Sequence, residues 1–241
     1  MTLQKIAEVK FPTSWATFLL LGFEEYTDSR AEGGTAATGL ALVLGDLHSA
    51  PPIVRIHSQC TTGDVFHSLR CDCHDQLHLA LRTIADAGDG VLVYEHQEGR
   101  GIGLMEKLRA YELQDEGLDT IEANLRLGHP IDRRDYRLPV AILGYLGIRS
   151  VRLMTNNPEK LYAVESAGVR VRERLGADVP ATSHSARYLA TKREQLGHLH
   201  GSAAQPWDRP ERFRTSLEGF APAVSGAKGH SSPPFLGTGK R

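Results

Sequence analysis

Residues 54–77 read VRIHSQCTTGDVFHSLRCDCHDQL and contain all three cysteines of the chain. Ile53 to His57 follows two prolines and is predicted to form a strand. After the last cysteine, DQLHLALRTIADAG repeats apolar residues at helical spacing and ends at Gly88, a residue type that commonly stops a helix. The cysteines therefore lie between a strand and a helix, and this order predicts an α/β fold.

The same alternation continues on both sides of this segment. Further strands are predicted at Phe18 to Phe23, Gly39 to Leu44, Val91 to Tyr94, Val151 to Met154 and Val169 to Arg172. Further helices are predicted from the QEGRGIG turn to about Gln114, and at Leu138 to Leu146, Pro158 to Ala167 and Ser185 to Leu199. The polar stretch EEYTDSRAEGGTAAT between the first two strands indicates a long flexible hairpin loop. We expect a single α/β domain over residues 1–200, with a mixed buried sheet flanked by helices.

The last segment differs from the rest in composition. Residues 201–241 are rich in Gly, Pro and Ser and show no apolar period. Such a segment buries too little surface to offset the entropy of ordering, so we predict a disordered C-terminal tail.

The overall charge restricts the partners. Lys and Arg total 28 and Asp and Glu total 29, so no long-range field attracts a nucleic acid or an acidic membrane. No apolar run approaches the roughly 20 residues that span a bilayer, and the charged start MTLQKIAEVK is unlike a signal peptide. We expect a cytoplasmic protein with no nucleic-acid or membrane partner. A small anionic ligand would need a local basic cluster.

The cysteines favour a catalytic metal site. Cys60, Cys71 and Cys73 form an odd, clustered set, which in a reducing compartment argues against disulfides. Structural zinc sites commonly have four protein ligands, whereas three leave a position for water or substrate, so the spacing indicates one catalytic Zn²⁺ per chain. Three inert buried thiols are the alternative. Nearby histidines could supply a fourth ligand: His57, His67 and His74.

These cysteines belong to a longer pattern. The segment 54–77 closely resembles the zinc segment of the GTP cyclohydrolase II family, in which three cysteines of this pattern bind zinc. The resemblance continues through YEHQEGRGIGLMEKLRAYELQDEGLDTIEAN, LGHPIDRRDY and VRLMTNNPEK, and fades after YLATKREQLGHL. It covers roughly residues 11–199, and several long motifs in one order make it specific.

The resemblance implies an activity and a set of site residues. Members of the family hydrolyse GTP to 2,5-diamino-6-(5-phosphoribosylamino)pyrimidin-4-one, formate and pyrophosphate, the first step of riboflavin biosynthesis, with Mg²⁺ on the triphosphate. We expect GTP as the small-molecule partner and a homodimer. The implied catalytic residues are Tyr111, Asp132 and Arg134. The implied GTP contacts are Arg55, Ile56, His57, Ser58, Gln59, Gln76, Glu98, Gly99, Arg100, Thr120, Thr155 and Lys160.

Two positions depart from the family pattern. Gln59 stands where the family commonly has Glu, so a carboxylate role in proton transfer or metal binding does not carry over to this chain. His74 and Asp75 replace what is usually a small Gly-containing pair.

Elementary chemistry supports a guanine site but leaves alternatives. The carboxylate of Glu98 can accept two hydrogen bonds from a ring edge, and the amide of Gln76 can donate and accept. An ordinary strand-to-helix turn with a solvated Glu is the alternative. The glycines of QEGRGIG match neither a dinucleotide fingerprint nor a phosphate loop that ends in Lys-Ser/Thr.

A phosphate site is indicated at TNNPEK. Pro158 favours the first turn of a helix, whose exposed N–H groups attract anions, and Lys160 and Thr155 add a charge and a hydroxyl. A plain capped helix is the alternative.

The implied catalytic groups also have simpler readings. Arg134 could attack the α-phosphate, but a guanidinium stays protonated, so electrostatic stabilisation is the simpler role beside Asp132 as base. PIDRRDY could equally be a solvated charge run. Tyr111 could protonate the opening ring or could be a core tyrosine.

Other functions remain as rivals. A homologue could stop at the formylamino pyrimidine, or a paralogue could bind zinc and nucleotide without turnover, for which Gln59 is a hint. A zinc nucleobase deaminase is disfavoured, because its His-x-Glu and Cys-x-x-Cys signature is missing.

Overall fold

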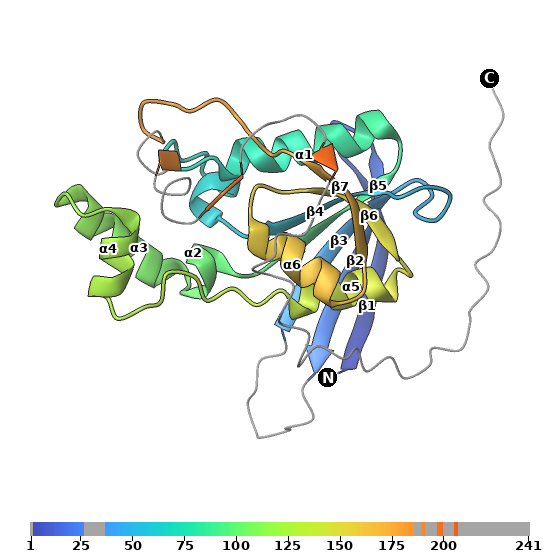
Figure 1. Ribbon diagram of the computed structural model, residues 1–241, viewed down its shortest axis with the longest axis horizontal. Coiled ribbons are helices and arrows are strands. Elements are labelled where there is room, and N and C mark those ends of the chain that lie inside the picture. Colours follow the sequence, from blue (N-terminus) through green and yellow to red (C-terminus); the bar gives the residue numbers. More distant parts are fainter. Residues whose placement is uncertain (1, 27–36, 186–188, 191–196, 200–204, 207–241) are drawn as a thin grey trace.

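The computed structural model describes residues 2–26, 37–185, 189–190, 197–199 and 205–206. Over this part of the chain, strands form one sheet in the order β1-β2-β3-β5-β4-β6-β7-β8 (Figure 1). The strands are β1 Thr2–Pro12, β2 Thr17–Tyr26, β3 Ala37–Leu44, β4 Ile53–Ser58, β5 Gly90–Glu95, β6 Ser150–Met154, β7 Arg170–Leu175 and β8 Gln205–Pro206.

The sheet has an antiparallel half and a parallel half. In the antiparallel half, β2 pairs with β1 and β3, and β3 also pairs with β5. In the parallel half, β4 lies between β5 and β6, and β6 pairs with β7. β8 adds an antiparallel edge to β7. The predicted mixed α/β sheet is confirmed, and its central strands β4 and β5 are buried along almost their whole length.

Helices cover both faces of the sheet. α1 (Cys73–Ala87) lies on one face, and α5 (Arg137–Tyr145) and α6 (Pro158–Ser166) lie on the other (Figure 1). Alternating strand residues supply two separate cores: Val91 and Val93 pack with the α5 and α6 side, and Leu92 packs with the α1 side. Successive side chains of a strand point to opposite faces of the sheet. Because both faces are buried here, such strands appear in the sequence as continuous apolar runs.

α5 approaches the sheet closely over one glycine. A Cβ on Gly39 of β3 would lie 3.2 Å from Ile142 Cδ1 and 3.2 Å from Leu138 Cδ2. Because this position lacks a side chain, the two α5 residues can pack directly on β3.

Three further helices lie beside the sheet and not on its faces. α2 (Glu98–Gly101), α3 (Leu104–Asp115) and α4 (Thr120–Arg126) extend away from the sheet (Figure 1). α4 was not predicted, although Asp119 and Glu122 form a capping box at its start, a pattern readable from the sequence.

The first strand was also missed. β1 is an edge strand whose apolar side chains are largely exposed, including Ile6 at 50% and Val9 at 49%. Its alternation of charged and apolar residues lacks the buried run that marked the other strands.

The predictions for the end of the chain are only partly testable. Most of the helix expected over Ser185 to Leu199, nearly all of the expected tail and the hairpin loop at residues 27–36 lie outside the described residues. Within the described part, residues 197–199 are not helical, so the predicted end of that helix at Leu199 is wrong. The Leu199 amide instead donates to the Asn156 carbonyl at 2.8 Å. None of the described helices is long and apolar enough to cross a bilayer.

The core on the α5 side predicts a large cost of truncation. Ile142 is fully buried at 0% exposure, so Ile142→Ala should lower the free energy of unfolding by about 2–5 kcal/mol. Ile6→Ala, at a half-exposed site on β1, should cost about 1 kcal/mol or less. Urea denaturation of both variants measures the difference, and equal losses would contradict this assignment of the core.

Candidate active site

A cavity opens where the parallel strands end. The segments after β4, β5 and β6 line it, together with the start of α1, α3 and the start of α6. Ligands of open α/β sheets commonly bind at the carboxyl ends of the strands. The empty space is about 1020 Å³ when the open mouth and the solvent in it are included.

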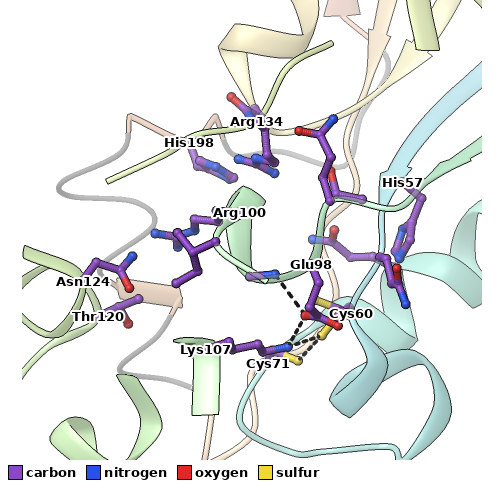
Figure 2. A pocket seen from close by; sticks show the side chains of 18 of the residues that line it. His57, Cys60, Cys71, Glu98, Arg100, Lys107, Thr120, Asn124, Arg134 and His198 are labelled. Atoms are coloured by element: carbon purple, nitrogen blue, oxygen red, sulfur yellow. Dashed lines mark hydrogen bonds and ion pairs between the residues drawn. The ribbon is translucent and has the colours of Figure 1, made fainter. Parts of the chain in front are cut away.

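All three cysteines line this cavity, and Figure 2 shows Cys60 close to Cys71. Their sulfurs all lie within 4.8 Å of one another, and Cys60 Sγ is 3.7 Å from Cys71 Sγ. Two sulfurs bound to one tetrahedral zinc at about 2.3 Å would be about 3.8 Å apart. Cys60, Cys71 and Cys73 thus have the donor type and spacing that zinc requires.

A tight loop holds the sulfurs together. Cys60 ends the segment after β4 and caps a π-helical turn, η1 (Thr61–Val65), while Cys73 begins α1. The Gly63 amide donates to Cys60 Sγ at 3.3 Å. A Cβ on Gly63 would lie 2.9 Å from Cys71 Sγ and 3.1 Å from Cys60 Sγ.

Asp64 fixes the same loop to the sheet. Its carboxylate accepts from the Cys60 amide at 3.0 Å and from the Tyr94 hydroxyl of β5 at 2.9 Å. It also lies 3.2 Å from His57 Nε2.

The thiols differ in pKa because their sulfurs lie close together. Hydrogen bonds from Cys71 and Cys73 lower the pKa of Cys60, with a further contribution from Lys107. The neighbouring Cys60 in turn raises the pKa of Cys71 to about 11. One thiolate is therefore favoured by the protein alone, and a bound cation would favour all three.

Lys107 of α3 joins this end of the cavity to Glu98. Its ammonium donates to Cys60 Sγ at 3.0 Å and to Glu98 Oε1 at 2.8 Å (Figure 2). It also donates to Thr62 Oγ1 at 2.8 Å. Burial alone would lower the pKa of Lys107, but Tyr111 and Cys60 raise it above its usual value. Lys107 therefore stays charged.

Glu98 is also bound to the loop that follows Cys60. It is only 7% exposed and accepts from the Thr61 amide at 2.6 Å and from the Gly99 amide at 3.0 Å. With Lys107, these donors occupy three of roughly four lone-pair positions of a carboxylate.

Two buried side chains beside the cysteines have unused nitrogens. Arg55 donates to Gln76 Oε1 at 2.7 Å and to the Met154 carbonyl at 3.2 Å, and Gln76 donates to Asp72 Oδ2 at 2.6 Å. Within the described residues, Arg55 Nε and His57 Nδ1 are buried and have no hydrogen-bond partner. Buried unsatisfied polar atoms that line a cavity favour a polar ligand there.

The opposite end is cationic. Lys160 is 5% exposed and donates to the Ile56 carbonyl at 3.0 Å. Burial, together with Arg134 and Arg55, lowers the pKa of Lys160. An anion in the cavity would offset this repulsion between buried cations.

The start of α6 faces the same end. Asn157 caps the helix by accepting from the Glu159 amide at 2.9 Å, and Pro158 is the first helical residue, as predicted. Thr155 Oγ1 accepts from the Asn157 amide at 3.0 Å. A capped N-terminus beside buried cations suits phosphate oxygens.

Arg134 is paired with Asp132. Asp132 Oδ1 accepts from the Arg134 backbone amide at 2.9 Å and from Arg134 Nε at 3.0 Å, and Arg134 Nη2 donates to Asp132 Oδ2. Burial would lower the pKa of Arg134, but Tyr136 and Asp132 outweigh it and raise the pKa. Arg134 is therefore a permanent cation in the cavity wall.

Nearly all predicted site residues come together in this cavity. Those that line it are Arg55, His57, Ser58, Gln59, Cys60, Cys71, Cys73, Gln76, Glu98, Gly99, Arg100, Tyr111, Thr120, Arg134, Thr155 and Lys160. Ile56 instead belongs to the core and contributes only its carbonyl, to Lys160. Asp132 lies behind Arg134 and does not line the cavity.

The proposed fourth metal ligands differ from one another in position. His57 lines the cavity but contacts Asp64. His67 and His74 pack against each other with tilted rings, their centroids 3.9 Å apart, and do not line it.

Gln59 is held by a histidine ring and a hydroxyl. Its side-chain oxygen lies 3.0 Å from His96 Nδ1, and its amide donates to Thr61 Oγ1 at 3.2 Å.

Several lining residues were not predicted. They are Gln97, Ile102, Lys107, Ala110, Gln114, Asn124, Asn156, Asn157 and His198. Lys107 stands four residues before Tyr111, on the same helical face, and this spacing could have identified it.

This combination of a thiol triad and buried cations defines an enzyme site that can hold a metal ion beside an anionic small molecule. The family described as GTP cyclohydrolase II matches residues 4–176. The chain therefore belongs to the GTP cyclohydrolase II family, as the sequence predicted.

Curated relatives agree over most of the chain. A GTP cyclohydrolase-2 of Neisseria meningitidis serogroup C is 48% identical over 198 residues, covering 82% of this chain and 96% of the relative. One from Proteus mirabilis is 48% identical over 206 residues, with 85% and 100% coverage. A solved structure of RibBX, a two domain 3,4-dihydroxy-2-butanone 4-phosphate synthase from A. baumannii, aligns with 64% of this chain and 34% of its own at 18% identity and a TM-score of 0.36.

The close packing of Gly63 predicts a sensitive metal loop. Gly63→Ala should push the sulfurs apart and weaken zinc binding by roughly 10–100-fold, the range for residues that support metal ligands. Gly144→Ala is the matched control, because a Cβ there meets nothing within 4 Å. Zinc retained during dialysis against a chelator measures the effect, and equal retention by both variants would contradict it.

Proposed function

We propose that this chain hydrolyses GTP to 2,5-diamino-6-(5-phosphoribosylamino)pyrimidin-4-one, formate and pyrophosphate, the first step of riboflavin biosynthesis, with one zinc bound by Cys60, Cys71 and Cys73. The observation that carries the proposal is that one cavity is lined by the sulfur triad and by the cations Lys160 and Arg134, and Figure 2 shows Arg134 across the cavity from Cys60 and Cys71. A purine nucleotide has its reacting ring and its phosphates at opposite ends in the same way.

The two ends of the cavity bind different parts of the substrate. When bound, zinc would activate a water for attack on C8 of the purine and so supply the ring-opening chemistry. The base therefore lies beside the cysteines. Lys160 and the N-terminus of α6 would hold the phosphates, and Mg²⁺ on the triphosphate would neutralise part of their negative charge.

The groups that recognise guanine already make hydrogen bonds within the protein. Glu98 has about one lone-pair position left after its three protein donors. Gln76 and Arg55 are bonded to each other, and Arg55 Nε is left to donate to the ligand. The base edge is thus read by this network together, with Glu98 contributing a single acceptor.

Arg134 acts by charge. It remains protonated in its pair with Asp132, so it stabilises the α-phosphate as pyrophosphate leaves. Asp132, with its oxygens bonded to Arg134, orients that guanidinium.

Tyr111 serves the release of formate. It lines the cavity from α3, with Arg70 and Lys107 over its ring at 4.9 and 5.7 Å from the centroid. Its hydroxyl is a proton donor for the nitrogen that leaves when the formamide is hydrolysed.

Product analysis tests the function as a whole. Purified protein with GTP and Mg²⁺ should yield formate and pyrophosphate in equal amounts, with the diaminopyrimidine detected by mass spectrometry. Removing zinc with a chelator should abolish ring opening, and adding zinc back should restore it. Accumulation of the formylated pyrimidine would indicate the shorter reaction, and tight nucleotide binding without products would indicate a binding protein.

Tyr111→Phe separates ring opening from formate release. The variant keeps the ring but loses the hydroxyl, so formate per GTP consumed should fall about 100-fold or more while the formylated pyrimidine accumulates. Tyr145→Phe, at a side chain that is 49% exposed and outside the cavity, should leave the product ratio unchanged. A normal formate yield from Tyr111→Phe would exclude the catalytic role.

A further inference from the structure

Lys107 lies between two buried acidic groups. Cys60 is 5% exposed and Glu98 is 7% exposed, and the Lys107 ammonium contacts the sulfur of one at 3.0 Å and the carboxylate of the other at 2.8 Å. One lysine therefore bridges a candidate metal ligand and a candidate base-recognition residue.

The charges at this point require a cation. Three thiolates and one divalent ion leave a net charge of −1, and the carboxylate of Glu98 adds another negative charge within the same buried space. Removing one partner from a buried charged pair is costly, because the other is left without compensation. The ammonium of Lys107 reduces this repulsion at both groups.

The bridge also continues into the backbone. Glu98 accepts from the amide of Thr61, the residue directly after Cys60. A carboxylate that Lys107 holds in place thus holds the start of η1, and η1 positions the sulfur.

We propose that Lys107 is a positioning residue that couples metal retention at Cys60 to base recognition at Glu98. This inference rests on the zinc and guanine roles of the proposed function. It adds that neither site is fully formed without the lysine between them, although Lys107 itself neither binds the metal nor changes the substrate chemically.

Metal competition tests the first half of the coupling. Lys107→Met keeps much of the apolar stem and removes the charge, so its Zn²⁺ affinity against a chromogenic chelator should fall roughly 10–100-fold, the range for groups that support metal ligands. Lys107→Arg should recover most of that loss. The matched control is Arg109→Met, which removes an exposed cation from the same helix. Equal zinc affinity of Lys107→Met and Arg109→Met, with unchanged melting temperatures, would overturn the proposal.

A double-mutant cycle tests the second half. Glu98→Gln removes one of the two negative charges, so Lys107→Met should cost less zinc affinity in the Glu98→Gln background than in the natural chain. Independent losses that multiply would show that the two residues are not coupled and would overturn the proposal.

Spectroscopy and nucleoside binding complete the test without turnover. In the Co²⁺-substituted protein, losing the hydrogen bond to Cys60 should move the sulfur-to-metal charge-transfer band to lower energy in Lys107→Met and not in Arg109→Met. Guanosine, which lacks phosphates, should bind about 10-fold more weakly to Lys107→Met, the loss of roughly one charge-assisted hydrogen bond. An unmoved band together with unchanged guanosine binding would overturn the coupling. Because these measurements need no product, a failure of the proposed reaction would remain distinguishable from a failure of the coupling.

Discussion

The convergence of three cysteine sulfurs on one point is the constraint on which the site depends. Cys60 follows the central strand β4 and Cys73 begins α1, so the contact between their sulfurs fixes the strand end against the helix start. Only a glycine fits at position 63 among these sulfurs. The loop therefore cannot relax without separating the sulfurs, and α1 must pack on its face of the sheet for the triad to exist.

The same placement explains why cations gather in the rest of the cavity. Parallel strands end at one edge of the sheet, so groups from β4 and from the segment after β6 meet there although they lie about 100 positions apart, as in the bond from Lys160 to the Ile56 carbonyl. Burying these cations is unfavourable, as the lowered pKa of Lys160 indicates. An anionic ligand relieves that cost, so the unfavourable part of the fold becomes a source of affinity.

Much of this structure could be predicted from local sequence patterns, and the exceptions share a cause. Buried strands and helices with clear apolar periods were found within a few residues, and the cysteine triad was identified because its members lie close in the sequence. β1 was missed because an edge strand needs no buried run. Lys107 shares a helical face with Tyr111, but its contact with Cys60, 47 positions earlier in the chain, cannot be predicted from that spacing. Asp132 was predicted to act as a catalytic base, because a motif cannot distinguish a side chain that lines a cavity from one that supports its neighbour.

The charges around position 59 explain why an amide is favourable there. A Glu at this position would add a negative charge directly before Cys60, in a loop that already contains the thiol triad and, through the Thr61 amide, the carboxylate of Glu98. The side chain of Gln59 instead bonds to the His96 ring and the Thr61 hydroxyl, which keeps the backbone before Cys60 in place. Lys107 then has two acidic groups to balance and not three. The substitution thus preserves the shape of the metal loop while lowering its negative charge, which is compatible with a site whose geometry matters more than an extra carboxylate.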